Sequence, residues 1–362
     1  MRTHRRFRRL GRVLLGVTMA ACLIPAGRLE AQAKLDNPEA YRDAKRAATA
    51  TFLDRNRPQE ERLEALKDLG YPDDGTFAAL LVLGNDRSQS DAIRLEALKR
   101  LQYDDKYVNA VLTVLEDRAD GGEDLDAGLI EDLNRRTTFI PPPQVRQRIQ
   151  SVLRTLLDDK RDKVRLFAYR AAVSNHDLVA VNLLAESLRE GQNVPIPLAD
   201  AIDLLDFDGS VNHIGTIRPY LHHEDSRVQA KAARTLAADP ESRAVIVELA
   251  RNTRTPEEVR LNALRSLARE DDKFGSYAIP LVEDAREDSK IRQAAMQDFV
   301  GRMNYNKVAP AEQIRFAQAV EKLAGEKDSR NDNASQLKEA AQELHAYLKQ
   351  AFPEIRTFYE KK

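Results

Sequence analysis

The sequence predicts an all-α fold, an α-solenoid of about eight stacked helical hairpins with a capping helix at each end. A nine-residue apolar pattern recurs at intervals close to 32 residues, and each interval leaves room for a second helix. Leucine and alanine dominate the apolar residues, aromatic residues make up only 6%, and tryptophan is absent. This composition is typical of thin layers of packed helices rather than of one large core.

Two segments show the recurring pattern in full, IRLEALKRL at 93–101 and VRLNALRSL at 259–267. Counting the first position as zero, positions 0, 4, 5 and 8 lie on one face of a helix. The eight occurrences begin at Glu61, Ile93, Leu125, Val164, Pro197, Val228, Val259 and Ile291. Their spacings are 32, 32, 39, 33, 31, 31 and 32 residues, which predicts an array of helical hairpins.

Two positions of the pattern are nearly constant. Position 4 is alanine in seven of eight repeats: Ala65, Ala97, Ala168, Ala201, Ala232, Ala263 and Ala295. A small residue there indicates that two helices approach closely. Position 1 is arginine in five repeats: Arg62, Arg94, Arg165, Arg260 and Arg292. Such an arginine can lay its stem on the next layer and donate to a carboxylate or a carbonyl.

Helix starts and second helices complete each predicted repeat. The side chains of Ser90, Asp225, Thr255 and Asp288 precede position 0 by three or four residues and are expected to cap the first helices. Second helices are expected at 77–82, 108–115, 145–157, 178–188, 214–221, 244–250 and 278–285. We expect these second helices to build the inner, partner-binding surface.

Residues 1–33 have the features of a secretory signal peptide. Residues 1–12 hold six arginines and no acid, an apolar stretch follows at 13–24, and Ala31-Gln32-Ala33 precedes Lys34. The apolar stretch is short for a membrane-spanning helix. We expect cleavage after Ala33, with lipidation at Cys22 as the alternative, because this single cysteine follows Met19-Ala20-Ala21 as in a lipobox.

The remaining chain is expected to contain an N-terminal capping helix at 34–55, the repeat array at 56–325, and a C-terminal capping helix and tail at 326–362. The leader holds seven arginines and one glutamate, so the rest of the chain has 50 basic and 57 acidic residues and a net charge of −7. Acids and bases are interspersed, which argues against a nucleic-acid or anionic-membrane surface. A chain cut after Ala33 has no cysteine and therefore no disulfide.

The repeats resemble HEAT-like repeats of the short type seen in phycobilisome lyases, whose signature is D-x-x-V-R-x-x-A-x-x-x-L. Asp225 through Leu236 fits with Gln229 in the arginine place, and Asp288 through Phe299 fits with Ile291 and Phe299 replacing Val and Leu. The resemblance covers roughly residues 56–325 and implies the fold. It implies scaffolds, adaptors or a few lyases as functions, and does not choose among them.

Three departures from the pattern are candidate sites. The interval of 39 residues places an insertion at 137–143, either a partner-binding loop or a tolerated surface loop. The acidic loop 116–126 could bind calcium, although it lacks the alternating spacing of a calcium loop and fits a solvated linker better. His222 and His223 lie together on a turn without a third zinc ligand indicated by spacing.

The sequence shows no catalytic constellation, phosphate loop or cofactor motif. We therefore expect a non-enzymatic, exported scaffold, periplasmic or secreted, that binds a protein or peptide and requires no cofactor. A lyase-like enzyme or chaperone and a structural envelope lipoprotein anchored at Cys22 remain as alternatives.

Overall fold

The computed structural model describes residues 38–70, 72–101, 106–117, 121–136, 142–208, 213–270, 272–305, 307–326 and 332–362. The predicted leader with Cys22 lies outside the described residues, as does most of the predicted insertion at 137–143. The described residues form helices and turns without a β-strand, which confirms the predicted all-α fold class.

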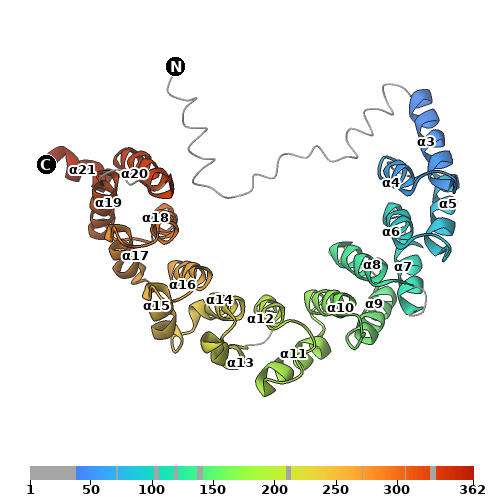
Figure 1. Ribbon diagram of the computed structural model, residues 1–362, viewed down its shortest axis with the longest axis horizontal. Helices are drawn as coiled ribbons and strands as arrows, with labels where there is room; N and C mark the ends of the chain where they lie inside the picture. The colour runs from blue at the N-terminus through green and yellow to red at the C-terminus, as the bar shows by residue number, and fades with distance from the viewer. Residues whose placement is uncertain are drawn as a thin grey trace. The chain divides into compact units, whose positions relative to one another are not determined.

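The chain divides into two compact units between Leu184 and Ala185, inside helix α11 (Figure 1). The helices from the N-terminal side to this division are α3 (Pro38–Leu53), α4 (Gln59–Lys67), α5 (Asp74–Asn85), α6 (Asp91–Arg100), α7 (Lys106–Glu116), α8 (Glu123–Arg136), α9 (Pro143–Leu156), α10 (Asp162–Ser174) and α11 (Leu178–Glu190). We call this part the first unit.

The second unit continues with α12 (Leu198–Phe207), α13 (Ile214–Ile217), the 3-10 helix η1 (Arg218–His222), α14 (Ser226–Thr235), the 3-10 helix η2 (Leu236–Ala238), α15 (Arg243–Arg251), α16 (Glu257–Glu270), α17 (Phe274–Glu283), α18 (Ser289–Asn304), α19 (Pro310–Ala324), α20 (Asp332–Ala351) and α21 (Pro353–Lys361). None of the helices in the described ranges combines the length and the apolar run needed to span a bilayer.

Each occurrence of the sequence pattern falls on one of the alternate helices, which we call first helices: α4, α6, α8 and α10 in the first unit, and α12, α14, α16 and α18 in the second. Apart from α12, each first helix packs against the helix that precedes it in the chain, as in α5 with α6 and α15 with α16. The N-terminal α3 packs against α4 in the same way, so it completes a hairpin as well as covering the end of the row.

Successive first helices also pack directly on one another within each unit. The pairs α8–α10 and α14–α16 are in more extensive contact than α7–α9 and α15–α17. Helices on the inner side of a bent row lie closer together than those on the outer side. At these junctions the first helices therefore lie on the inner side of the row, contrary to the expectation that the second helices form the inner surface.

The alanine of the pattern allows this close packing. Ala97, Ala168, Ala201, Ala232, Ala263 and Ala295 are fully buried. Ala65 on α4 is only half-buried, because α4 has a first-helix neighbour, α6, on one side only among the described helices. Buried alanines of this kind leave no room for a larger side chain without separating the layers.

Candidate functional site

The arginine at position 1 of the pattern ties the two helices of a hairpin together. Nε of Arg62, Arg94, Arg260 and Arg292 donates to the carbonyl of the residue ten positions earlier, at 2.9, 3.0, 3.1 and 3.1 Å. Those carbonyls lie at the end of the preceding helix, where a helix has no internal donor left for them. Each arginine is buried and caps that helix from its neighbour.

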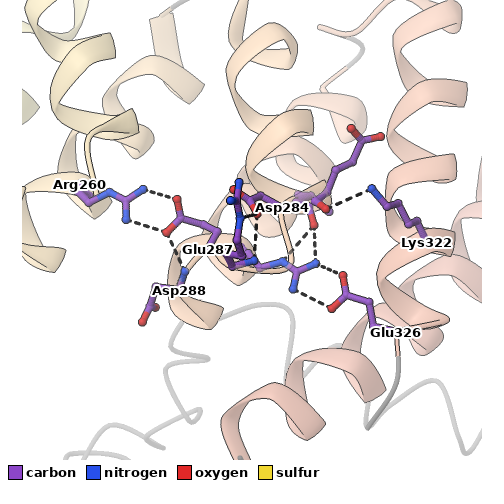
Figure 2. A network of polar contacts seen from close by, with 10 residues as sticks. Arg260, Asp284, Glu287, Asp288, Lys322 and Glu326 are labelled. Carbon is purple, nitrogen blue, oxygen red and sulfur yellow. Dashed lines mark hydrogen bonds and ion pairs between the residues drawn. The ribbon is translucent and has the colours of Figure 1, made fainter. Parts of the chain in front are cut away.

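The same guanidinium groups reach toward the next hairpin. In the second unit, Nη1 and Nη2 of Arg260 donate to both carboxylate oxygens of Glu287, at 2.7 and 2.5 Å (Figure 2). Nη1 of Arg292 donates to Oε2 of Glu326 at 2.9 Å. Bidentate pairs of this kind fix the orientation of both groups as well as adding energy. We call this set of arginine contacts the arginine ladder.

Turn residues brace the second-unit part of the ladder. The backbone N–H of Asp288 donates to Oε1 of Glu287 at 2.7 Å, which holds the carboxylate toward Arg260. The side chain of Asp284 accepts from the backbone N–H of Arg286 at 3.0 Å within the same turn (Figure 2). The backbone of the turn before α18 thus holds the carboxylate of Glu287 in place for Arg260.

An aspartate or asparagine eight residues before the arginine is a part of the ladder that we did not recognise in the sequence. Asp54, Asp86, Asn252 and Asp284 each accept from the backbone N–H two residues later at 3.0 Å. These side chains shape the turn that brings the arginine back to its carbonyl. The signal was present as an Asx residue at constant spacing, outside the nine-residue pattern.

Repeats that depart from the ladder compensate in different ways. Gln229 of α14 donates from Nε2 to the carbonyl of Leu221 at 2.7 Å, so an amide replaces the missing arginine. Arg165 of α10 is only half-buried, and its Nη1 donates to the carbonyl of Asp159 in the turn. The contact with a carbonyl in the preceding helix or turn is therefore a feature of the array and not of one residue type.

Asp126 occupies the arginine position of α8 and is buried. Its Oδ2 forms an ion pair with Nη2 of Arg161 at 2.8 Å. Nε of Arg161 also donates to Oδ1 of Asp159 at 2.9 Å. Burial raises the pKa of Asp126, and the positive charge of Arg161 opposes that rise. This cluster replaces the arginine ladder at one junction of the first unit.

The other carboxylates described in the acidic loop also face cations. Glu116 binds Arg148, Asp117 binds Arg87 and Asp124 binds Lys163. Residues 118–120 of the loop lie outside the described residues. No group of three or more potential metal ligands occurs within the described ranges.

Two of the four predicted helix caps make a capping hydrogen bond. Asp225 and Asp288 accept from the backbone N–H groups of Arg227 and Lys290, at 2.8 and 2.7 Å. Ser90 occupies the N-cap position of α6, but its side chain makes no cap hydrogen bond. Thr255 lies two residues before α16, which begins at Glu257, so Pro256 takes the position that we expected for a cap.

Nδ1 of His223 accepts from the backbone N–H of Asp225 at 3.0 Å. His222 is exposed and lines a shallow surface hollow with Arg218 and Glu241. His223 thus takes part in the hydrogen bonding of the turn before α14, whereas His222 faces the surface hollow.

The exposed faces of the first helices carry a different chemistry in each repeat. On α16, Arg265 and Arg269 are exposed. On α18, Asp298 is half-buried near Arg265, and its buried Oδ2 has no hydrogen-bond partner among the described residues. Burial raises the pKa of Asp298 to about 6, opposed by the positive charge of Arg265.

Comparison with known proteins supplies no activity for this chain. No protein family model matches the sequence, and no curated protein matches it. The chain is similar to the structure of human deoxyhypusine hydroxylase in complex with glycerol, with 14% identity, a TM-score of 0.31, and coverage of 86% of this chain and 100% of that chain.

It is also similar to the complex of CpcE and CpcF of phycocyanin lyase from Nostoc, with 20% identity, a TM-score of 0.33, and coverage of 80% and 97%. Similarity at this level supports no argument about substrate or chemistry. The hairpins and their packing within each unit form a helical repeat array, as the repeated sequence pattern predicts.

Proposed function

We propose that the protein is an exported binding scaffold that holds a protein or peptide partner against the exposed faces of its first helices. One observation supports this most directly. Arg62, Arg94, Arg260 and Arg292 are buried in contacts between helices, so the constant residues of the pattern maintain the array. The residues that vary between repeats are therefore the ones available to bind a partner.

The variation is clear at position 3 of the pattern, which is half-buried in five of the first helices. This position is Glu96 in α6, Phe167 in α10, Asp200 in α12, Lys231 in α14 and Asn262 in α16. Repeat proteins bind partners across several neighbouring units, with contacts spread over many side chains. A surface whose chemistry changes at each step can distinguish one partner from another.

Cross-linking in cells tests the surface. A photoreactive residue at Glu131 of α8 or Arg269 of α16 would report on the first helices. The same residue at Thr113 of α7 or Arg251 of α15 is the matched control, and all four positions are exposed. We expect defined partner adducts from the first-helix positions. Adducts confined to the controls would contradict the proposed surface, and no adduct from any position would contradict the scaffold.

Export has its own test. The intact mass of protein recovered from the cell envelope is expected to match a chain that begins at Lys34. A lipidated Cys22 would instead support the anchored alternative. A full-length chain beginning at Met1 in the cytoplasm would contradict both routes.

A lyase-like or chaperone activity is the second candidate, and Asp298 is the observation that favours it. Carboxylates with a pKa shifted by burial gather at functional sites more often than elsewhere. If Asp298→Asn removed the cellular function while the fold and partner binding stayed intact, the enzymatic candidate would replace the scaffold.

A further inference from the structure

The helices α14 and α16 present a strip of cations on the exposed side of the second unit. Lys231 and Arg234 come from α14, which contains no acidic residue. Arg265 and Arg269 come from α16, where they lie one helical turn apart. These helices pack directly on each other, and Arg234 and Arg265 occupy the same position of the repeat pattern.

Half of this strip is already neutralised within the protein. Asp203 of α12 accepts from Nζ of Lys231 and from Nη2 of Arg234, each at 2.5 Å. Arg265 and Arg269, by contrast, form no ion pair or side-chain hydrogen bond with any residue that the structure describes, and both are exposed. Two guanidinium groups of the strip therefore have no direct ion pair or side-chain hydrogen bond within the described residues.

The neighbouring α18 contributes one carboxylate near the strip. Besides the neutral Gln293 and Gln297, its half-exposed side chains include Asp298. The positive charge of Arg265 opposes the rise in the pKa of Asp298, but the two side chains form no ion pair.

We infer that Arg265 and Arg269 form a docking site for an acidic peptide segment of a partner protein. The inference rests on the proposed scaffold function and specifies the chemistry of the partner. The planar guanidinium group matches a carboxylate in a bidentate geometry, so two arginines one turn apart can hold two carboxylates of one segment.

The surroundings of the site favour a peptide over a nucleic acid. A phosphate backbone carries closely spaced charges and requires a long basic track. Here the track ends at α12, where Asp200, Asp203 and Asp206 follow one another along the adjacent helix. With two of these aspartates paired to the cations of α14, no excess positive charge remains there for a polyanion to follow, whereas a short acidic segment needs only the two arginines of α16.

Binding of short labelled probes to the full chain tests the inference. The test variant is Arg265→Glu/Arg269→Glu. The matched control is Arg251→Glu/Arg254→Glu, which makes the same charge change at two exposed arginines in and after α15. The probes are a fluorescein-labelled peptide of alternating Glu and Ser, its counterpart with Gln for Glu, and a single-stranded oligonucleotide of similar charge. Circular dichroism verifies that both variants are folded.

We expect the acidic peptide to bind, its affinity to fall about tenfold in the test variant, and the control to change by less than about twofold. Binding should also weaken as salt is added. Equal binding of the Gln peptide, or an equal loss in the control, would overturn the inference. Tighter binding of the oligonucleotide that depends on the same arginines would assign the strip to nucleic acid and overturn it as well.

The cellular cross-linking experiment separates this inference from the function on which it rests. If the test variant kept all partner adducts formed from the photoreactive residue at Glu131, the scaffold would stand and the acidic-segment site would be rejected. Loss of those adducts in the test variant, with the control unchanged, would support both.

Discussion

The two units use the same buried arginine in different ways. In the first unit, Arg62 caps its carbonyl and donates from Nη2 to the neutral side-chain oxygen of Gln89 at 2.8 Å. In the second unit, Arg260 and Arg292 cap equivalent carbonyls and also pair with the carboxylates of Glu287 and Glu326. The carbonyl contact is common to both units, whereas the contact with the next hairpin varies.

This difference separates what the hairpin requires from what the stack can change. The ten-residue spacing between arginine and carbonyl is set by one turn and two helix ends, so it recurs wherever that turn recurs. The partner in the next layer lies about one repeat further along the chain and can change without altering the hairpin. Each junction can therefore have its own strength.

Loss of the arginine should show the largest difference between the units. Arg260→Ala leaves the carboxylate of Glu287 buried without its partner, and we expect it to lower the free energy of unfolding by about 3–5 kcal/mol. Arg62→Ala leaves only neutral groups unpaired and should cost about 1–3 kcal/mol. Urea denaturation followed by circular dichroism compares the two, and equal losses would mean that the ion pair adds nothing to the junction.

The alanine position tests how tightly the layers pack. Ala263 is fully buried between α16 and its neighbours, so Ala263→Leu should destabilise by about 1–3 kcal/mol through overpacking. Ala65 is half-buried, and Ala65→Leu should change stability by less than about 0.5 kcal/mol. An unchanged denaturation midpoint for Ala263→Leu would show that α16 can move away from its neighbours without loss.

Position 7 of the pattern holds a carboxylate in both units, with different surroundings. Asp132 in α8 accepts a hydrogen bond from the hydroxyl of the buried Tyr107. Asp298 in α18 has an oxygen without a hydrogen-bond partner among the described residues, and burial raises its pKa from 3.8 to about 6. The folded protein therefore binds a proton at Asp298 more tightly than the unfolded chain does.

The pH dependence follows from that shift. The ionised carboxylate of Asp298 costs stability above about pH 6, and the cost disappears below about pH 4. Asp298→Asn should raise the free energy of unfolding by about 1–2 kcal/mol at pH 8, with the gain fading by pH 4. Asp132→Asn should instead lower it by about 1–3 kcal/mol because it weakens the bond from Tyr107. A gain for Asp298→Asn that did not vary with pH would contradict the role of burial.

Periodicity in the sequence was sufficient to locate the first helices. The apolar residues at positions 0, 4, 5 and 8 report burial directly, and Ala263 or Leu264 shows no exposed surface in the fold. The same periodicity could not tell which helix of a hairpin faces the inside of the row. That choice depends on how closely successive layers approach, which is a tertiary property.

The partners of the arginines were also beyond the sequence alone. The arginine position predicted a carbonyl or carboxylate acceptor, but Val282 and Glu326 meet at Arg292 only after three helices have packed. The substitution of Gln229 for arginine looked like a loss in the sequence. In the fold its amide reaches the carbonyl of Leu221, because a short 3-10 helix brings that carbonyl closer.

The smallest effect expected between the units concerns two glycines inside helices. A β-carbon at Gly84 of α5 would lie 2.6 Å from Cγ of Leu98, a fully buried side chain. A β-carbon at Gly301 of α18 would meet nothing within 4 Å. Glycine costs a helix about 0.5–1 kcal/mol relative to alanine, so Gly301→Ala should stabilise the protein by about that amount. Gly84→Ala has the same propensity gain but must displace Leu98, and we expect a net loss of about 1 kcal/mol. Thermal denaturation of the two variants shows directly whether each substitution stabilises or destabilises the protein. Stabilisation by Gly84→Ala would show that Leu98 can shift freely, and hence that the α5–α6 hairpin of the first unit is packed more loosely than its arginine contact implies.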